Sequence, residues 1–340
     1  MKILKVLILF VFSTFFVFQS YGQDPAFSQY FANPLYLNPA FAGTAICPRV
    51  NLNYRNQWPG IGQSYVTYTA NYDTYVDKIG GGLGLFVMND VAGAGDLTTS
   101  QISGIYSYRI PISKNFSMNA GLEAAYRQLS LDWSQLTFGD MIDPRYGFIY
   151  PTQEDIINYP SSKGYVDFAT GVIGYGKTKK INYYFGFSAH HITKPDQGFI
   201  SDDSYLPTKI TFNIGSVIPV NQFGVYRTNS SMRSQNGVWI SPNFLLQKQQ
   251  DFLQLNYGMY AIKGPLVGGL WLRQSSENFD AFIILLGFEG DTWKIGYSYD
   301  ITISELNNSN TQGAHELSFS LRLPCRSKSR AYETINCPSF

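Results

Sequence analysis

Polar and apolar side chains alternate with a period of two along most of the chain after residue 23. Between residues 116 and 127 every second position is mainly apolar, and the positions between them are polar or small. The same alternation returns at 253–260, 292–300 and 316–323. Because successive side chains of a strand point to opposite faces, this period predicts strands with one apolar face.

The character of the two faces separates a membrane barrel from a soluble β-sandwich, which alternates in the same way. One face carries charged side chains in mid-strand, as suits a water-filled lumen. The other is aliphatic with aromatic residues towards segment ends, as suits a lipid band flanked by interfacial girdles. Charged residues make up only 14% of the chain and aromatic residues 16%, whereas soluble domains contain roughly 25% charged residues. The sequence predicts an all-β fold, a transmembrane antiparallel β-barrel.

Placing strands by this pattern gives about fourteen of them, an even number that suits a single-chain bacterial barrel with both termini periplasmic. The expected strands begin near Arg49, Ser64, Gly82, Thr98, Phe116, Tyr165, Asn182, Lys209, Trp239, Phe252, Leu266, Phe279, Thr292 and Ala314.

The connections between these strands alternate in length, as in barrels with long outer loops and short periplasmic turns. The long ones, expected outside, are 131–164, 193–207 and 301–313. The short ones, expected in the periplasm, are 110–115, 176–180, 263–265 and 289–291. The segment 219–237 is the exception, because it is long but falls on the periplasmic side, so it could hide a further hairpin.

The ends of the chain suggest export. Residues 1–22 combine Lys2 and Lys5 with an apolar run and a small-residue cleavage site, which predicts a signal peptide. A membrane anchor is the alternative, but the apolar run is shorter than the roughly 20 residues that span a bilayer. Residues 23–47 form an irregular segment, either a plug in the lumen or a crossing of the rim. Residues 48–323 form the barrel and 324–340 a periplasmic tail, and the expected location is the outer membrane.

Three cysteines, Cys47, Cys325 and Cys337, lie outside the expected strands. Closure of a barrel pairs its first and last strands, which would bring Cys47 and Cys325 to the same rim. We expect a disulfide that involves Cys325, with either Cys47 or Cys337 as its partner. Because three is an odd number, one cysteine must stay unpaired or pair elsewhere. Three free thiols are the alternative.

The chain offers little reactive chemistry. Adjacent His190 and His191 are expected on opposite faces of a strand, so they should not share a metal ion. Ser188 shares a face with His190, which leaves a hydrolase as an alternative. The glycine-rich run 80–84 lacks the Lys-Ser/Thr of a phosphate loop. We assign no catalytic, cofactor-binding or metal-binding residue and expect a protein that is not an enzyme. With 25 basic and 24 acidic residues, its charge gives no support for nucleic-acid binding.

Charged side chains on the expected lumenal face either line a path for solutes or form a polar network that fills and rigidifies the barrel. They are Glu123, Arg127, Asp167, Lys294, Asp300, Glu316 and Arg322.

Several motifs are more specific than this alternation. They are the Pro-, Asn- and aromatic-rich run from Gln23 to Gly43, and the shorter segments Tyr54 to Trp58, Ser188 to Pro195, Tyr297 to Asp300 and Gly313 to Ser318. Together they resemble the PorP/SprF family of Bacteroidetes outer-membrane proteins, and the resemblance extends from near residue 23 to about residue 323. The chain departs from the family pattern around 227–236 and in its cysteine-bearing tail.

This resemblance implies a component of the type IX secretion system. It implies roles in gliding motility and in the export, surface attachment or display of large adhesins with type B C-terminal domains. The implied partners are the secreted adhesin or other cargo, periplasmic lipoproteins and OmpA-like peptidoglycan-binding proteins, with outer-membrane lipid around the barrel. No catalytic residues come with it.

The long outer loop 132–162 is the candidate surface for a protein partner, because exposed aromatic residues favour interfaces. Its aromatic residues include Trp133, Phe138, Tyr146, Phe148 and Tyr150. Alternatively, these residues fold back as a lid over the barrel. The alternative function is a porin-like solute channel. About fourteen strands is fewer than the 16 to 18 of open porins, so conduction would depend on whether the N-terminal segment and lumenal side chains block the path.

Overall fold

A computed structural model describes residues 23–325, apart from 63–64, 94–95, 155, 157, 179–180, 201–203, 221–236, 277 and 304–307. The expected signal peptide, Cys337 with most of the C-terminal tail, and the segment 227–236 lie outside the described residues.

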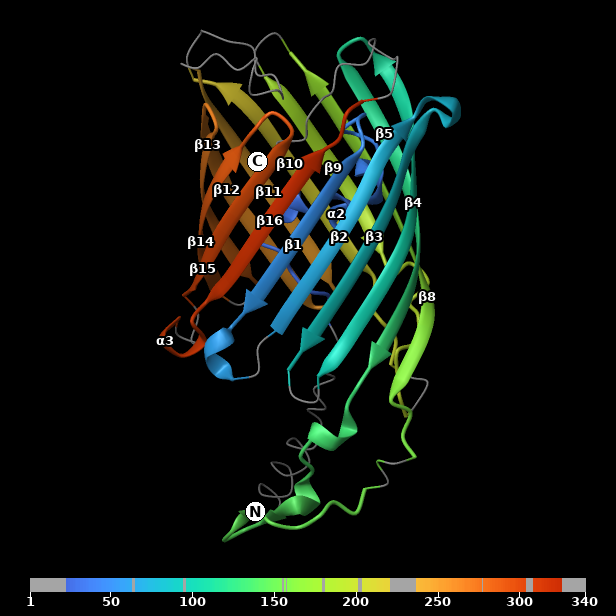
Figure 1. Ribbon diagram of the computed structural model, residues 1–340, viewed down its shortest axis with the longest axis vertical. Coiled ribbons are helices and arrows are strands. Elements are labelled where there is room, and N and C mark those ends of the chain that lie inside the picture. Colours follow the sequence, from blue (N-terminus) through green and yellow to red (C-terminus); the bar gives the residue numbers. More distant parts are fainter. Residues whose placement is uncertain are drawn as a thin grey trace, which may run out of the picture.

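Within these residues, fourteen antiparallel strands close into one barrel, in which each strand pairs with the next along the chain and the last pairs with the first (Figure 1). They are β1 (Arg49–Gln57), β2 (Tyr65–Val76), β3 (Gly81–Ala92), β4 (Leu97–Ser113), β5 (Phe116–Ser130), β8 (Ser162–Lys177), β9 (Asn182–His190), β10 (Lys209–Pro219), β11 (Val238–Gln249), β12 (Phe252–Lys263), β13 (Leu266–Ser275), β14 (Phe279–Glu289), β15 (Trp293–Thr302) and β16 (Ala314–Arg322). The predicted fold class and strand positions are confirmed, since each strand begins within three residues of its expected start.

The alternation along each strand sorts side chains between lumen and outer wall. In β5, Ser117, Asn119 and Arg127 are buried, whereas Leu122 and Tyr126 on the other face are 63% and 51% exposed. Closure satisfies the backbone hydrogen bonds of every strand with its neighbours, which a lipid environment requires. No helix among the described residues is long and apolar enough to cross a membrane.

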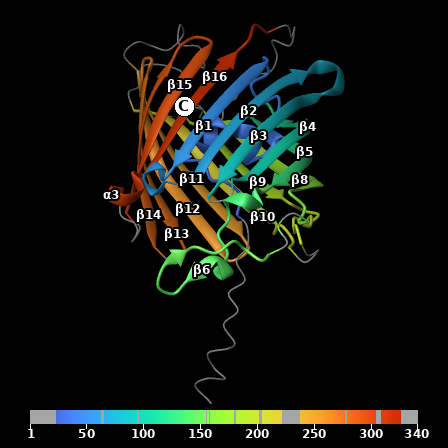
Figure 2. The ribbon, with the colours of Figure 1, turned by 60° about the horizontal axis from the view of Figure 1, so that its bottom comes forward.

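The two ends of the barrel differ. At the end where β1 finishes, here the loop end, lie the long connections 131–161, 191–208 and 303–313. The helix α3 (Asn308–Thr311) and the helices η3 (Pro59–Ile61), η5 (Trp133–Gln135) and η6 (Gly139–Met141) also belong to this end, which Figure 2 brings forward. At the opposite end, here the turn end, 114–115, 178–181, 264–265 and 290–292 are short, and η4 (Asp77–Ile79) joins β2 to β3. Which end faces the cell exterior stays a prediction.

The connection between β10 and β11 also belongs to the turn end, and β10 pairs directly with β11. Its residues 221–236 are not described, so the hairpin considered there stays untested.

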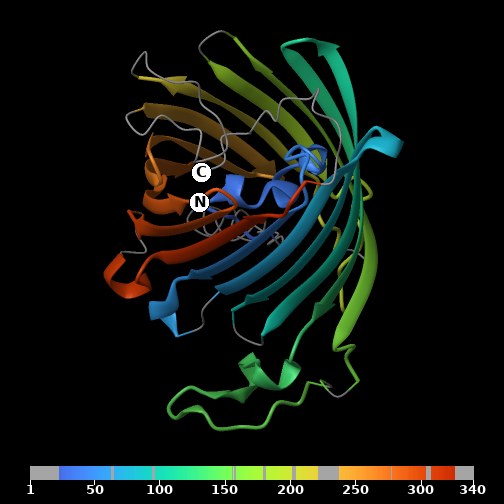
Figure 3. The ribbon, with the colours of Figure 1, turned by 45° about the horizontal axis from the view of Figure 1, so that its top comes forward.

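Residues 23–47, here the plug segment, lie inside the barrel rather than across its rim. They fold into three short helices, η1 (Tyr30–Ala32), α2 (Pro34–Leu37) and η2 (Pro39–Phe41), seen in blue within the lumen in Figure 3. Leu35, Asn38 and Ala40 are each 0% exposed. The lumen is therefore filled by the chain's own N-terminal segment.

The inner wall facing the plug is polar on one side and apolar on the other. The apolar side consists mainly of inward residues of β11 to β14, and aromatic plug residues pack on it. The rings of Tyr30 and Trp271 lie 5.4 Å apart, and those of Phe31 and Tyr260 lie 4.8 Å apart. Of the two placements considered for residues 23–47, the structure has the plug in the lumen, where it packs against an apolar wall as well as a polar one. The buried apolar wall residues include Trp239, Leu245, Tyr260, Ile262, Val267, Trp271, Ala281, Ile283 and Leu285.

The plug is fixed covalently at the turn end. Cys47 forms a disulfide with Cys325, across a sequence separation of 278 residues. The register that pairs Arg49 with Arg322 brings the two cysteines together. Of the two partners considered for Cys325, the structure has Cys47.

We expect replacement of both bonded cysteines, Cys47→Ser with Cys325→Ser, to lower the free energy of unfolding by about 2–4 kcal/mol, because the bond restricts the unfolded chain. Thermal unfolding followed by the heat-dependent mobility of the barrel on gels measures this. Reduction of the wild type should reproduce the lower midpoint. Full alkylation of Cys47 and Cys325 in the unreduced protein would contradict the bond.

Candidate functional site in the plugged lumen

Three charged residues from adjacent strands meet at the polar side of the lumen. Arg55 of β1 lies 3.0 Å from the Asp300 carboxylate of β15 and 3.1 Å from the Glu316 carboxylate of β16. All three side chains are no more than 2% exposed. The strand register places Arg55 directly opposite Glu316. A buried charge is tolerated only when paired, and here each carboxylate shares the same guanidinium.

The plug completes this cluster. The backbone N–H groups of Ser28 and Gln29 donate to the two oxygens of Glu316, at 2.8 and 3.1 Å. The Ser28 hydroxyl donates to Asp300 at 2.6 Å, and Arg273 of β13 donates to the same carboxylate at 2.8 Å. The plug backbone thus satisfies acceptors that the wall leaves open, as buried polar groups require.

A second charged cluster holds the beginning of the plug near the loop end. His191 contacts Asp24 of the plug through Nε2 at 2.7 Å and Asp167 of β8 through Nδ1 at 2.6 Å. Arg127 and Lys209 each lie 3.2 Å from the Asp24 carboxylate. An imidazole between two carboxylates is held most strongly when it is charged.

The charge states follow from this arrangement. Burial opposes the charge on Asp24, but the positive charges of His191 and Lys209 outweigh it and hold the pKa of Asp24 well below its usual range. Burial likewise disfavours a charged His191, but the negative charge of Asp24 and the hydrogen bonds to both carboxylates raise the pKa of His191.

The middle of the plug packs against the wall at very short range. Asn38 donates to the carbonyls of Val172 and Phe187. A Cβ on Gly82 would lie 2.1 Å from the Ala42 carbonyl oxygen, and one on Gly121 would lie 2.4 Å from the Ala40 nitrogen. These wall positions accept only glycine because the plug backbone occupies the space of a side chain.

The prediction that His190 and His191 point to opposite faces of a strand is wrong. The strand β9 ends at His190, and His191 adopts a positive φ of 56° that turns its ring into the lumen. Ser188 donates to the Leu37 carbonyl at 2.8 Å, and His190 lies 3.4 Å from the same oxygen. Both side chains therefore contact the plug backbone, and neither is paired as nucleophile and base.

The charged residues predicted for the lumen divide between these clusters and the turn end. Glu123, Arg127, Asp167, Asp300 and Glu316 are buried in the lumen. Lys294 pairs with Glu289 at 3.2 Å, and Arg322 is half-buried at the end of β16.

The sequence prediction missed Asp24, Ser28, Arg55, His191 and Arg273. Arg273 follows the inward positions of β13 in steps of two, so the alternation could have found it. Arg55 follows the inward positions of β1 in the same way. Asp24 and Ser28 gain their roles only through the folded plug, and His191 gains its role through the left-handed turn after β9.

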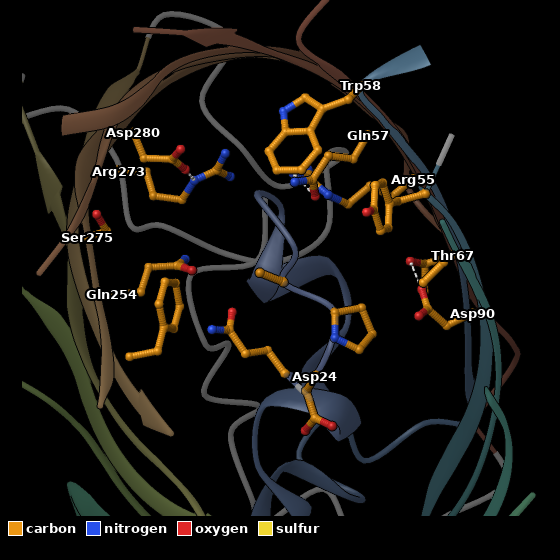
Figure 4. A pocket seen from close by; sticks show the side chains of 16 residues that line it. Asp24, Arg55, Gln57, Trp58, Thr67, Asp90, Gln254, Arg273, Ser275 and Asp280 are labelled. Carbon is orange, nitrogen blue, oxygen red and sulfur yellow. Dashed lines mark hydrogen bonds and ion pairs between the residues drawn. The ribbon is translucent and has the colours of Figure 1, made fainter. Parts of the chain in front are cut away.

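At the loop end, the lumen holds a cavity of about 380 Å³ beside the first described residues of the plug (Figure 4). Its walls are the ends of β1, β3 and β13 and the beginnings of β2, β12 and β14, and Gln23 to Ala26 of the plug also line it. Within the described residues, no group of three His, Cys, Asp or Glu side chains is placed to hold a metal ion.

The loop 131–161 extends away from the barrel rather than closing it, as the green segment of Figure 1 shows. It contains the short paired strands β6 (Ile142–Asp143) and β7 (Gly147–Phe148). Tyr146, Phe148 and Tyr150 are 74%, 60% and 50% exposed. Phe138 is half-buried, and the Trp133 ring packs 5.1 Å from that of Tyr159 near the base of the loop.

A family model described as "Type IX secretion system membrane protein PorP/SprF" matches residues 19–321. The chain belongs to the PorP/SprF family. Membership of this family together with the closed barrel places the protein in the outer membrane, as a barrel of the type IX secretion system. No curated protein shows a significant match to the chain.

Several solved structures are similar to this PorP/SprF barrel in fold. The toluene transporter TbuX of Ralstonia pickettii is 9% identical, with a TM-score of 0.46 and coverage of 85% of this chain and 93% of that one. A mutant of the monoaromatic hydrocarbon channel TodX is 12% identical, with a TM-score of 0.46 and coverage of 85% and 94%. The outer membrane protein Omp33 of Acinetobacter baumannii is 8% identical, with a TM-score of 0.40 and coverage of 82% and 100%. Similarity at this level assigns no function.

Replacing Arg55 with alanine should lower the free energy of unfolding by about 3–5 kcal/mol, because Asp300 and Glu316 lose a buried cation. Urea unfolding of the detergent-solubilised barrel, followed by tryptophan fluorescence, measures the change. Arg145→Ala, at an exposed position of the loop, serves as the control. If both variants unfold like the wild type, the cluster does not stabilise the plugged barrel.

Stability should also depend on pH through His191. Its pKa is raised on folding, so its contribution is complete below the unfolded value of about 6.5 and is lost as pH rises through the folded value. We therefore expect the thermal unfolding midpoint of the wild type to fall as the pH rises from about 6.5 through the folded pKa of His191. The midpoint of His191→Gln should fall much less over the same pH interval. His315→Gln is the matched control. Identical pH profiles for wild type and His191→Gln would refute the assignment.

Proposed function

We propose that this protein is a non-enzymatic assembly barrel that supports export or surface attachment of adhesins with type B C-terminal domains. In this proposal the loop end faces outward and holds the secreted protein. The turn end faces the periplasm and docks a lipoprotein or an OmpA-like peptidoglycan-binding protein. Family membership is the observation that carries this proposal.

The loop 131–161, here the arm, supports the role of the loop end. Asp143 accepts hydrogen bonds from the backbone of Arg145 and Tyr146 and from the Tyr150 hydroxyl. Asp140 accepts from Thr152 and from the Gln153 backbone. The arm therefore has internal order of its own, and an ordered surface with exposed aromatic rings loses little entropy on binding a partner.

The filled lumen weighs against the porin-like alternative. A conducting barrel needs a continuous water path, whereas the plug here is held by buried ion pairs of Asp24, a packed aromatic core and a disulfide. Opening such a path would expose paired charges and apolar surface together, which is costly.

Deletion of residues 140–159 should leave the barrel folded and release the adhesin from the cell surface into the medium. The barrel keeps its strand pairing, because β5 and β8 pair along their full lengths outside the deleted segment. Immunoblots of cells and medium measure retention, and gel mobility of the unheated barrel confirms folding.

A finer variant tests the aromatic surface itself. Tyr146→Ser, Phe148→Ser and Tyr150→Ser together should weaken retention about ten-fold or more, since central aromatic contacts dominate interfaces. The control is Ile61→Ser, because Ile61 is also an exposed apolar residue at the loop end. Unchanged adhesin retention in the triple variant would count against the arm as the binding surface.

A further inference from the structure

The cavity at the loop end combines charges, amides and aromatic rings on facing walls. Figure 4 shows Asp90 and Thr67 on one wall, Gln254, Arg273 and Asp280 on the other, and Asp24 at the floor. The cavity volume of about 380 Å³ lies at the small end of the range for ligand sites, which begins near 300 Å³. It can enclose one or two side chains.

Neither arginine of the cavity wall is available to an anion. Arg55 is committed to Asp300 and Glu316 beneath the cavity. Arg273 is committed to Asp280 and Asp300. An anionic ligand would therefore meet guanidinium groups whose charge is already balanced by carboxylates.

Asp90 differs from the other cavity carboxylates. Its Oδ1 accepts a hydrogen bond from Thr67 at 2.6 Å. Asp24, by contrast, faces His191, Lys209 and Arg127. Among the described residues, no cation forms an ion pair with Asp90. A half-buried carboxylate without a counter-charge is only partly solvated, so a cation that enters the cavity would be stabilised there.

Gln254 provides an independent sign that the cavity accepts a ligand. Its side chain lines the cavity and is 4% exposed, yet its Nε2 has no hydrogen-bond partner among the described residues. A buried amide donor of this kind is normally satisfied. A carbonyl oxygen from a bound molecule would satisfy it.

Aromatic rings complete the site. Trp58, Tyr65 and Phe252 line the cavity, and the Trp58 and Tyr65 rings meet edge to face at 5.6 Å. Trp58 holds a positive φ of 57°, which is unusual for a bulky residue, and its backbone N–H donates to the Gly313 carbonyl at 2.8 Å. Aromatic faces attract ammonium and guanidinium groups and cover the methylene stems of such side chains.

We propose that this cavity binds the side chain of a lysine or arginine presented by an extended peptide segment of the secreted partner. The cation lies against Asp90 and the aromatic rings, and a backbone carbonyl of the segment accepts from Gln254. The inference rests on the proposed function, which supplies the source of the peptide. It adds a second contact site for the secreted partner, a polar one in the cavity, beside the aromatic surface of the arm.

Binding of blocked pentapeptides to the purified full-length barrel in detergent tests the site. The probes are acetyl-Gly-Ser-Lys-Ser-Gly-amide and the same peptide with glutamine or glutamate in place of lysine, titrated by saturation-transfer NMR. The lysine peptide should bind most tightly. Asp90→Asn should weaken its binding about five-fold or more, because it removes the charge partner, and Gln254→Leu should weaken all three peptides. Asp251→Asn, at an exposed loop-end position outside the cavity, should bind like the wild type.

Equal binding of the lysine and glutamine peptides to the wild type would overturn the inference, and this comparison does not depend on any variant folding. Unchanged affinity in a folded Asp90→Asn barrel would overturn it as well. Adhesin retention in cells is read separately. If the peptides do not discriminate while deletion of the arm still releases the adhesin, only the cavity assignment fails.

Discussion

The carboxylate of Glu316 is the point on which the interior of this barrel depends. It accepts from Arg55 of the wall and from two backbone N–H groups of the plug, with no exposed surface of its own. If the plug left, this carboxylate and Asp300 would lose the donors that offset their burial, and the cost would be several kcal/mol. The charges of the wall and the backbone of the plug are therefore one structural unit, and neither is stable in this form without the other.

The remaining contacts of the plug extend this unit along the barrel axis. The disulfide ties its end to the turn end, the aromatic rings of its first helix fill the apolar side, and Asp24 binds three cationic side chains near the loop end. Wall glycines such as Gly121 let the plug approach at backbone distance. A barrel sealed in this way is a rigid platform. The two surfaces proposed for binding a partner, the arm and the mouth cavity, both lie at the loop end.

Much of the fold could be predicted from sequence, because lipid outside and a distinct interior impose a strict period of two. That period located every strand of the barrel, although not the short pair β6 and β7, and it assigned Glu316 and Asp300 to the interior. It could not reveal what the interior holds. Most inward residues of β13 and β14 are apolar, as their lipid-facing residues also are, so the alternation of these strands does not show which face points inward. The inward position of His191 could not be predicted, because it depends on a left-handed turn just after a strand. Asp24 and Ser28 carry no local pattern, and most of their partners, among them Arg127 for Asp24 and Asp300 for Ser28, lie more than 100 residues away along the chain. Such long-range pairings arise from closure and cannot be read from neighbouring residues.

The central claim, that the plug segment seals the lumen, is tested most directly by conductance across a planar lipid bilayer. The barrel is reconstituted at known protein density, with folding verified by gel mobility. A sealed lumen predicts a bilayer whose conductance stays at the protein-free level across the applied voltages. Steady, large openings from the folded wild-type protein would mean that water and ions pass the plug, and would contradict the account.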